Sequence, residues 1–261
     1  MLSIYQIILF FFLPCVGILL VLYALGRFWK NAGIADAGWC ACMAWCAGML
    51  AWRLPTLDVQ PWRAWLVGAA GVLWALRLGG FIFKNRVLGR PEDKRYTELR
   101  ASKGELGIVV WFLAQAPFAM LFASSFYAAL QPHAFSWAVP LAVVIWCLSV
   151  GGEALADAQL ARFRADPANQ GTTCRRGLWR YSRHPNYFFE WLHWLTYVLL
   201  AWGASWGIFC LSWLSPAVML FMLFRVSGIP LTEKQALSRR GDDYREYQRT
   251  TSVFVPWPPK T

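Results

Sequence analysis

The sequence predicts an all-α, polytopic integral membrane protein with seven transmembrane helices. The chain has 261 residues, of which 58% are hydrophobic, and its mean hydropathy is +0.39. Seven apolar stretches approach the roughly 20 residues that a helix needs to cross a bilayer. Of the 25 Lys and Arg, all but Arg53, Arg63 and Arg77 lie toward one side, in alternate connections, at the end of the last stretch or in the tail that follows it. Composition and charge distribution together exclude a soluble domain.

The seven predicted spans follow one another with short or charged connections. The first has no basic segment before it and no small-residue cleavage site, so we expect it to be retained and not removed as a signal peptide. Several of the 17 Trp lie near span ends, as expected for interfacial anchors. In chain order the spans are Ser3–Leu25, Gly33–Trp52, Trp62–Phe83, Leu106–Leu130, Phe135–Gln159, Tyr187–Trp202 and Trp206–Ser227.

The positive-inside rule orients these spans with the N-terminus outside and the C-terminus in the cytosol. The outside connections, 131–135 and 202–206, are short, and the basic inside connections are long. Function tends to lie on long loops carried by a rigid scaffold. We therefore expect one seven-helix membrane domain, 1–261, whose cytosolic loops 84–105 and 161–186 and tail 228–261 form the functional site.

The formal net charge of +11 is explained mostly by this topology. A second interpretation is an anionic ligand at the cytosolic face. Nucleic acid does not fit, because the basic residues are divided among short loops. The seven cysteines form no CxxC pair. Cys40, Cys42 and Cys46 cannot share one helix face, so we interpret them as packing residues and expect no metal site.

Ionisable groups within membrane spans are costly and usually functional, and six of those in this chain form a candidate set. Under the predicted topology all six belong to the cytosolic half of the membrane, where they could converge on one polar cavity. The alternative is ion pairs that only tie helices together, such as Arg77 with Asp36 or with Asp157. The six are Asp36, Arg77, Glu153, Asp157, Glu190 and His193.

The strongest local motif runs from Gly177 to Glu190 and reads GLWRYSRHPNYFFE. Ser182 or His184 could cap a helix with Pro185 in its first turn, where a missing N–H costs nothing. Free N–H groups at such a helix start, with Arg180 and Arg183 beside them, would suit a phosphate. The alternative is a basic cluster that binds lipid headgroups.

Several motifs together resemble a known family. They are Arg183-His-Pro-Asn-Tyr-x-x-Glu190 after Gly177-Leu-Trp-Arg-Tyr, Glu153-x-x-x-Asp157-x-Gln159, and Asp243-Tyr-x-x-Tyr247 with Pro256. Asp36, Trp74-x-x-Arg77 and Arg95-Tyr96 extend the likeness over nearly the whole chain. The chain resembles the bacterial branch (domain of unknown function 1295) of the steroid 5α-reductase family, which is related in fold to isoprenylcysteine carboxyl methyltransferases.

The resemblance implies a membrane reductase in the bacterial cytoplasmic (inner) membrane. It would bind NADPH from the cytosol and reduce a carbon–carbon double bond conjugated to a carbonyl. The substrate would be a steroid-like or other apolar lipid that enters from the bilayer between helices two, three and four. The resemblance says nothing of oligomeric state.

The resemblance also implies roles for particular residues. Asp36 would be the acid at the substrate carbonyl, with Tyr96 as the fallback donor and Glu190 as a further catalytic candidate. Two departures put a steroid substrate in doubt: Phe189 replaces a usual glycine, and Trp74 stands near the position of the tyrosine that donates to the steroid ketone. The cofactor-binding residues would be Arg77, Asn85, Glu153, Asp157, Arg164, Arg180, Arg183, His184, Asn186, Tyr187, Tyr244 and Tyr247.

Two other functions remain open. Isoprenylcysteine-type methyltransferases, which use S-adenosylmethionine, share Arg-His-Pro-x-Tyr and a tail with Glu and spaced tyrosines. Their pattern fixes neither Asn186 nor Glu190, and S-adenosylmethionine is cationic whereas NADPH is anionic. A transporter or channel would explain the intramembrane charges, but these gather on one side and do not line a path to the midplane.

Overall fold

The computed structural model describes residues 3–53, 59–131, 136–226 and 228–260, which form helices joined by turns and loops and contain no strand. The chain divides into two compact units. Unit 1 comprises Met1–Ala134 and Gly203–Ser212, and unit 2 comprises Phe135–Trp202 and Trp213–Thr261. Of the predicted outer connection 131–135, only Gln131 lies among the described residues.

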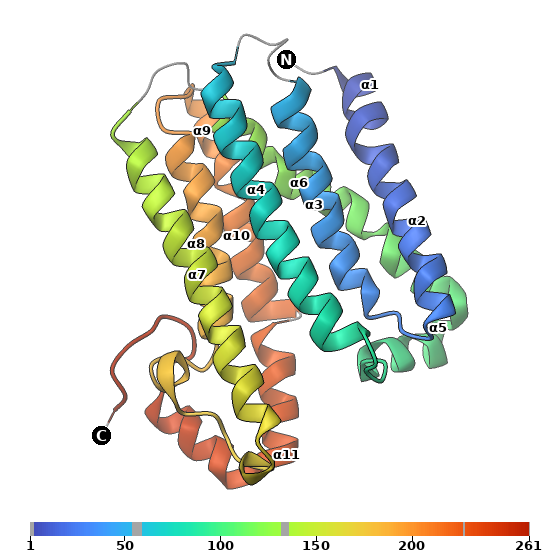
Figure 1. The fold of residues 1–261 in the computed structure, drawn as a ribbon, viewed down its shortest axis with the longest axis vertical. Coiled ribbons are helices and arrows are strands. Elements are labelled where there is room, and N and C mark those ends of the chain that lie inside the picture. Colours follow the sequence, from blue (N-terminus) through green and yellow to red (C-terminus); the bar gives the residue numbers. More distant parts are fainter. Residues whose placement is uncertain (1–2, 54–58, 132–135, 227, 261) are drawn as a thin grey trace. The chain divides into compact units, whose positions relative to one another are not determined.

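Unit 1 is built mainly from long helices. The first helix has three parts, α1 (Ile4–Ile7), the π-helical η1 (Ile8–Phe12) and α2 (Leu13–Phe28). The helices that follow are α3 (Ile34–Arg53), α4 (Pro61–Ile82) with its π-helical end η3 (Phe83–Val87), α5 (Lys94–Leu113), α6 (Gln115–Ala129) and α9 (Trp206–Ser212). Figure 1 shows α2, α3 and α4 side by side, and α3 contacts both neighbours.

Small residues let α3 and α4 approach closely. A Cβ added to Gly68 or Gly71 would lie 2.4 Å from Cβ of Ala51 or 2.6 Å from Cβ of Ala47. Close backbone approach through small residues is typical of helix pairs in membranes. The α3–α4 pair therefore forms the rigid centre of unit 1.

The buried cysteines act as packing residues, as predicted. Cys40 faces α4, where its Cβ lies 3.0 Å from a Cβ added to Gly79. Cys42 and Cys46 instead face α2: the Cys42 thiol donates to the Cys15 carbonyl, and Cys46 Sγ lies 3.8 Å from Cys15 Sγ. The prediction that the three do not share one face is confirmed, and all three are free thiols.

Gly104 divides α5 into a polar and an apolar part. Its φ of 65° breaks the helix, a conformation that glycine adopts without steric cost. The polar part, Lys94 to Lys103, belongs to the predicted loop 84–105, so that loop contains a helix that the sequence analysis did not anticipate. The apolar part continues into α6 after a turn at Ala114.

Unit 2 is centred on two helices, α7 (Ala138–Ala165) and α8 (Pro185–Leu200), which pack against each other. Two short 3-10 turns, η4 (Pro167–Asn169) and η5 (Gly177–Arg180), lie in the connection between them. The unit is completed by α10 (Leu214–Phe221), its π-helical end η6 (Met222–Val226) and α11 (Ile229–Thr250).

The exposed face of α7 is apolar and its buried face is partly polar. Leu141, Val144, Leu148 and Leu155 are 41–55% exposed, whereas Ser149, Glu153 and Asp157 are buried. This is the reverse of a helix on a soluble protein. The outer face of α7 is therefore suited to lipid.

Six helical stretches among the described residues are long and apolar enough to cross a membrane, which indicates an integral membrane protein. The sixth predicted span, Tyr187–Trp202, is not among them; it corresponds to α8, which has 16 residues and is about 24 Å long at 1.5 Å per residue. A bilayer core is about 30 Å thick, so the crossing of α8 stays a prediction. The six stretches are Ile4–Phe28, Ile34–Trp52, Pro61–Val87, Lys94–Ala129, Ala138–Ala165 and Trp206–Thr250.

Candidate functional site

In unit 2, the predicted polar residues lie on the facing sides of α7 and α8. Glu153 and Asp157 are 3% and 6% exposed, and Glu190 and His193 are 8% and 0% exposed. The amide of Asn186, in the first turn of α8, donates to Asp157 Oδ1 at 3.3 Å. Of the six ionisable residues expected to converge, Glu153, Asp157, Glu190 and His193 are thus buried in α7 and α8, and Asp157 is hydrogen-bonded to Asn186. We call Glu153, Asp157, Asn186 and Glu190 the polar cluster.

The Phe189 ring on α8 packs against Gly152 on α7, beside the polar cluster. A Cβ added to Gly152 would lie 2.5 Å from the Phe189 ring. The ring therefore occupies the space that a side chain at position 152 would need. The large side chain at Phe189 is thus matched by a small residue on the facing helix.

The start of α8 is only partly as predicted. Pro185 is the first residue of the helix, but no side chain caps it. Ser182 Oγ instead donates to the carbonyl of Phe254 and accepts from the His184 N–H, and the His184 ring lies beside Glu233. The predicted cap by Ser182 or His184 is therefore wrong, because both side chains are held by α11 and the chain that follows it.

Arg183 and Glu233 form an ion pair at the entrance to α8. Arg183 Nε donates to Glu233 Oε1 at 2.7 Å, and the two side chains are only 11% and 15% exposed. Glu233 Oε2 accepts from Gln248 at 2.8 Å. Tyr244 OH donates to Glu233 Oε1, and His184 Nε2 lies 3.3 Å from the same oxygen. We call these five residues the Arg183–Glu233 latch.

The latch uses much of the hydrogen-bonding capacity of Arg183. Besides the bond from Nε, Nη1 donates to the carbonyls of Gln248 and Thr251. Tyr247 extends the attachment, because its hydroxyl donates to the carbonyls of Trp179 and Ser182. Arg183, Tyr244 and Tyr247 therefore stabilise the conformation of the motif before α8.

His184 is held as part of the same assembly. It is 2% exposed, and its ring stacks on Tyr187 at 5.3 Å, whose hydroxyl lies 3.2 Å from Thr232 Oγ1. Burial lowers the pKa of His184 below its ordinary value, and the neighbouring Glu233 carboxylate offsets only part of that effect. His184 is therefore favoured in its neutral form.

Gly177 fixes the motif to the end of α7. Its φ is +59°, and an added Cβ would lie 2.4 Å from the Gln159 amide. Gln159 Oε1 accepts the Leu178 N–H at 2.9 Å, and the Trp179 indole donates to the Ala156 carbonyl. The motif is thus held by α7 on one side and by α11 on the other.

Basic side chains remain exposed in the last turn of α7 and in the connection that follows it. Arg162, Arg164, Arg176 and Arg180 are all exposed, whereas Arg175 donates to Asp243 at 2.8 Å. Of the predicted phosphate-binding arginines, Arg164 and Arg180 are therefore accessible from solvent.

In unit 1, Asp36 lies in the first turn of α3 and accepts hydrogen bonds from α5. Tyr96 OH donates to Asp36 Oδ1 at 2.8 Å. The Asp36 Oδ2 atom lies 3.4 Å from Arg95 Nη2 and 3.5 Å from Arg86 Nη1. Tyr96 is 2% exposed, whereas the Asp36 side chain is 27% exposed. The charged partners of Asp36 among the described residues are Arg86 and Arg95 rather than Arg77.

Arg77 and Asn85 lie near the end of α4 and in η3. The Arg77 guanidinium lies 6.0 Å from the Phe81 ring centroid, and the Asn85 amide donates to the Phe81 carbonyl at 2.9 Å. Both are partly buried. The π-helical geometry of η3 is of a kind often found at functional positions.

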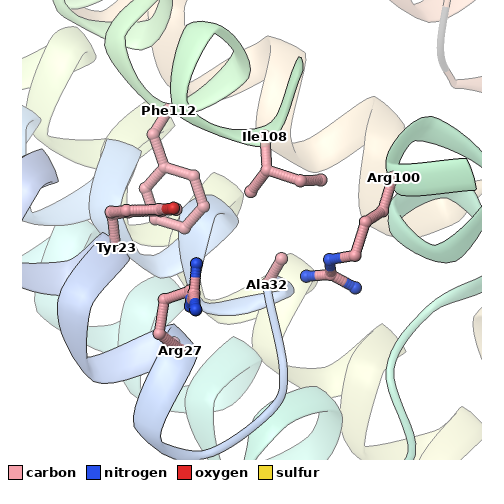
Figure 2. A pocket seen from close by; sticks show the side chains of 7 residues that line it. Tyr23, Arg27, Ala32, Arg100, Ile108 and Phe112 are labelled. Atoms are coloured by element: carbon pink, nitrogen blue, oxygen red, sulfur yellow. The ribbon is translucent and has the colours of Figure 1, made fainter. Parts of the chain in front are cut away.

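Figure 2 shows a small hollow in unit 1, with Arg27 and Arg100 on its rim and the ring of Phe112 on its wall. Glu105 lies within 3.5 Å of Arg27 and 2.7 Å of Arg100, and Glu92 pairs with Arg100. These carboxylates balance the arginines, so we assign no anion to the hollow. The contacts instead attach α5 to α2.

Sequence reasoning missed Glu233, Gln248, Arg86 and Arg95. No spacing rule pairs positions 50 or 60 residues apart. The signal that was available was chemical: Arg95 stands next to Tyr96 in the motif, and Glu233 is an acid in a strongly basic tail. Among the described residues, no group of three or more His, Cys, Asp or Glu could hold a metal ion.

The fold and site define a helical membrane protein with a polar cluster buried between two helices and a basic connection that leads into it. The family model of a protein of unknown function (DUF1295) matches residues 22–251, and the chain belongs to this family. No curated protein and no solved structure matches the chain.

Proposed function

We propose that the protein is an NADPH-dependent reductase of a carbon–carbon double bond conjugated to a carbonyl in a lipid, related to the steroid 5α-reductases and placed in a bacterial inner membrane with its site toward the cytosol. The observation that carries the proposal is the hydrogen bond between Asn186 and Asp157 within the polar cluster. Asn186 and Glu190 are the positions that the reductase pattern fixes and the methyltransferase pattern does not.

The exposed residues of unit 2 fit an anionic dinucleotide. Arg164 at the end of α7 and Arg176 and Arg180 in the connection after it are exposed donors, and guanidinium groups bind phosphates well because they present paired N–H donors. Arg183 belongs to the latch, so in this proposal it positions the start of α8. Asn186 would bind the cofactor, with its amide oriented by Asp157.

The bound NADPH would supply a hydride to one alkene carbon and leave as NADP⁺. The chain's own residues would supply the rest: a proton for the other carbon and a donor that stabilises the developing enolate oxygen. Asp36 accepts from Tyr96 and lies beside two guanidinium groups. The transferable proton of this pair is therefore on the Tyr96 hydroxyl, and Asp36 would orient it.

Ligand-dependent thermal stability of the purified protein tests the proposal. A ligand selective for the native state stabilises it, by about 2.7 kcal/mol at a hundredfold excess over Kd. NADPH should raise the melting temperature, NADH should raise it less because it lacks the additional phosphate, and S-adenosylmethionine should leave it unchanged.

The same assay with variants locates the site. Asn186→Ala should weaken NADPH binding about tenfold, the scale of one lost hydrogen bond, without loss of folding. Gln131→Ala removes an amide from unit 1 and should bind as the wild type does. Stabilisation by S-adenosylmethionine alone would move the assignment to a methyltransferase.

A further inference from the structure

Residues 251–260, which follow α11, form a closed loop that we call the return loop. The Lys260 N–H donates to the Thr250 carbonyl at 2.8 Å, which brings the two ends of the loop together. Figure 1 shows this segment turning back from the end of α11 toward the helices of unit 2. Its middle residues, and not its ends, therefore reach toward the membrane helices.

Three hydrogen bonds fasten the return loop to the motif before α8. Arg183 N–H donates to the Ser252 carbonyl at 2.8 Å, and Trp257 N–H donates to the Tyr181 carbonyl at 2.9 Å. The third runs from Ser182 Oγ to the Phe254 carbonyl at 2.7 Å. The loop and residues 181–183 therefore form one connected piece of structure.

Phe254 attaches the return loop to α8 and η6 through aromatic contacts. It is 5% exposed, and its ring packs on Phe188 and Trp191 in the first two turns of α8, with centroids 5.6 and 5.9 Å away. On its other side lies Phe224 of η6, at 5.2 Å. The tip of the loop thus lies level with the ends of two apolar helices.

Two apolar side chains beside Phe254 have no cover in the structure. Val255 is 52% exposed and Trp257 is 68% exposed. Phe224, in contact with Phe254, is itself 36% exposed on a helix that is apolar enough to span a membrane. The lipid-facing surface of that helix therefore continues onto the tip of the loop.

We infer that the tip of the return loop, Phe254 to Trp257, is an interfacial membrane anchor that places Val255 and Trp257 in the headgroup region of the bilayer. Tryptophan favours this region because its ring is apolar and its N–H is polar. The exposed cation Lys260 at the end of the loop suits an anionic lipid surface. The bilayer would then hold residues 181–183 through the loop. The inference does not depend on the proposed reductase activity.

Spin labelling in lipid nanodiscs tests the anchor. A label on Val255→Cys is introduced into a chain whose exposed Cys147 and Cys210 are replaced by serine, and the discs contain phosphatidylcholine and phosphatidylglycerol. Collision with apolar oxygen is compared with collision with a water-soluble nickel chelate. The control label is at Asp242→Cys on α11, where the native side chain is 94% exposed, and the chain without an added cysteine supplies the background.

The oxygen-to-nickel collision ratio should be several-fold higher at position 255 than at position 242. Equal ratios would overturn the inference. Shielding of position 255 from both reagents, relieved when the protein is diluted in excess lipid, would also overturn it, because a second copy and not lipid would then cover the loop.

A second variant tests the link to the motif. Trp257→Asp disfavours membrane contact while leaving the backbone N–H that Tyr181 needs. In nanodiscs, hydrogen exchange at the amide of Arg183 should become several-fold faster in this variant and should not change in Arg245→Ala. Unchanged exchange in Trp257→Asp would show that the loop holds the motif without help from the bilayer.

Discussion

Asp36 distinguishes two interpretations of the unit 1 cluster, one catalytic and one purely structural. Its carboxylate accepts from Tyr96 and lies beside Arg86 and Arg95. If the cluster serves catalysis, Asp36 and Tyr96 act together on the substrate carbonyl. If it serves only folding, Asp36 ties α3 to α5.

Asp36→Asn and Tyr96→Phe should each lower turnover by about two to four orders of magnitude, the usual scale for a general acid or oxyanion donor. NADPH affinity should be unchanged in both. The measurement is NADPH consumption with lipid enones, corrected for the folded fraction. Asp93→Asn is the matched control, because Asp93 also pairs with Arg95. Full turnover by folded Asp36→Asn protein would leave Asp36 a purely structural role.

His184 should make unit 2 sensitive to mild acid. Because its pKa is lowered in the folded protein, the unfolded chain takes up a proton first as the pH falls. Its contribution to stability is present above about pH 6.5, the ordinary histidine pKa, and is lost as the pH falls through the folded value. The melting temperature should therefore drop below about pH 6.5, and less steeply in His184→Gln. Parallel pH profiles of the two proteins would contradict this.

For single residues, the sequence predicts the chemical type of a side chain's role better than it predicts which other side chains it contacts. The resemblance implies that Asn186 and Asp157 both bind the cofactor, and the two side chains are hydrogen-bonded to each other. Arg183 was expected to bind phosphate, yet Glu233 and two carbonyls hold it. Only the fold of α11 brings those acceptors to it, and no local pattern encodes that approach.

Among the elements, the attachment of α11 to the start of α8 is the contact with the clearest energetic consequence. The Arg183–Glu233 pair is nearly buried. Removing one member of such a pair leaves the other without compensation.

Glu233→Ala should destabilise unit 2 by about 3–5 kcal/mol, the cost of breaking a buried pair. Glu246→Ala on the same helix is the control. Its pair with Arg249 is exposed, and such pairs contribute about 0–1 kcal/mol. Denaturation of both variants in detergent measures the difference. Equal effects would mean that solvent screens the latch as it screens the surface pair.

A helix boundary could be predicted from the sequence where a single local residue determines it. Pro185 opens α8 as expected, since proline fits a first helical turn. The polar helix before Gly104 and the helix α11 were expected only as loop and tail. Both are polar, and their helical state depends on contacts such as Arg100 with Glu92 and Arg183 with Glu233, which hydropathy does not report.

For the whole molecule, α8 decides the topology. With seven spans, the connection between α7 and α8 and the turn between α8 and α9 lie on opposite sides of the membrane. If α8 does not cross, they lie on the same side. Charge favours the first arrangement, because Arg162 to Arg183 form one of the basic clusters.

Cysteine labelling in intact cells tests this arrangement. In a chain with Cys147 and Cys210 replaced by serine, Ser205→Cys should react with a membrane-impermeant maleimide from outside. Thr172→Cys should react only after the membrane is permeabilised. Both native residues are exposed. Reaction of both from the same side would show that α8 is not a span.

The all-helical membrane class was predictable because hydropathy and charge act over whole segments. The division into two units was not, since it depends on which helices pack together: α9 belongs to unit 1 and α10 to unit 2, although they lie in one apolar stretch of sequence.

Gly177 restricts the substitutions that chains of this family can accumulate at this position. Its φ of +59° disfavours any side chain, and the Gln159 amide fills the space that a Cβ would need. Two separate barriers thus oppose every substitution, and a change at Gln159 would remove only one of them. A second substitution therefore cannot restore a variant at position 177. In a large mutant library we expect glycine alone to survive there, whereas the exposed neighbour Arg176 tolerates many residues.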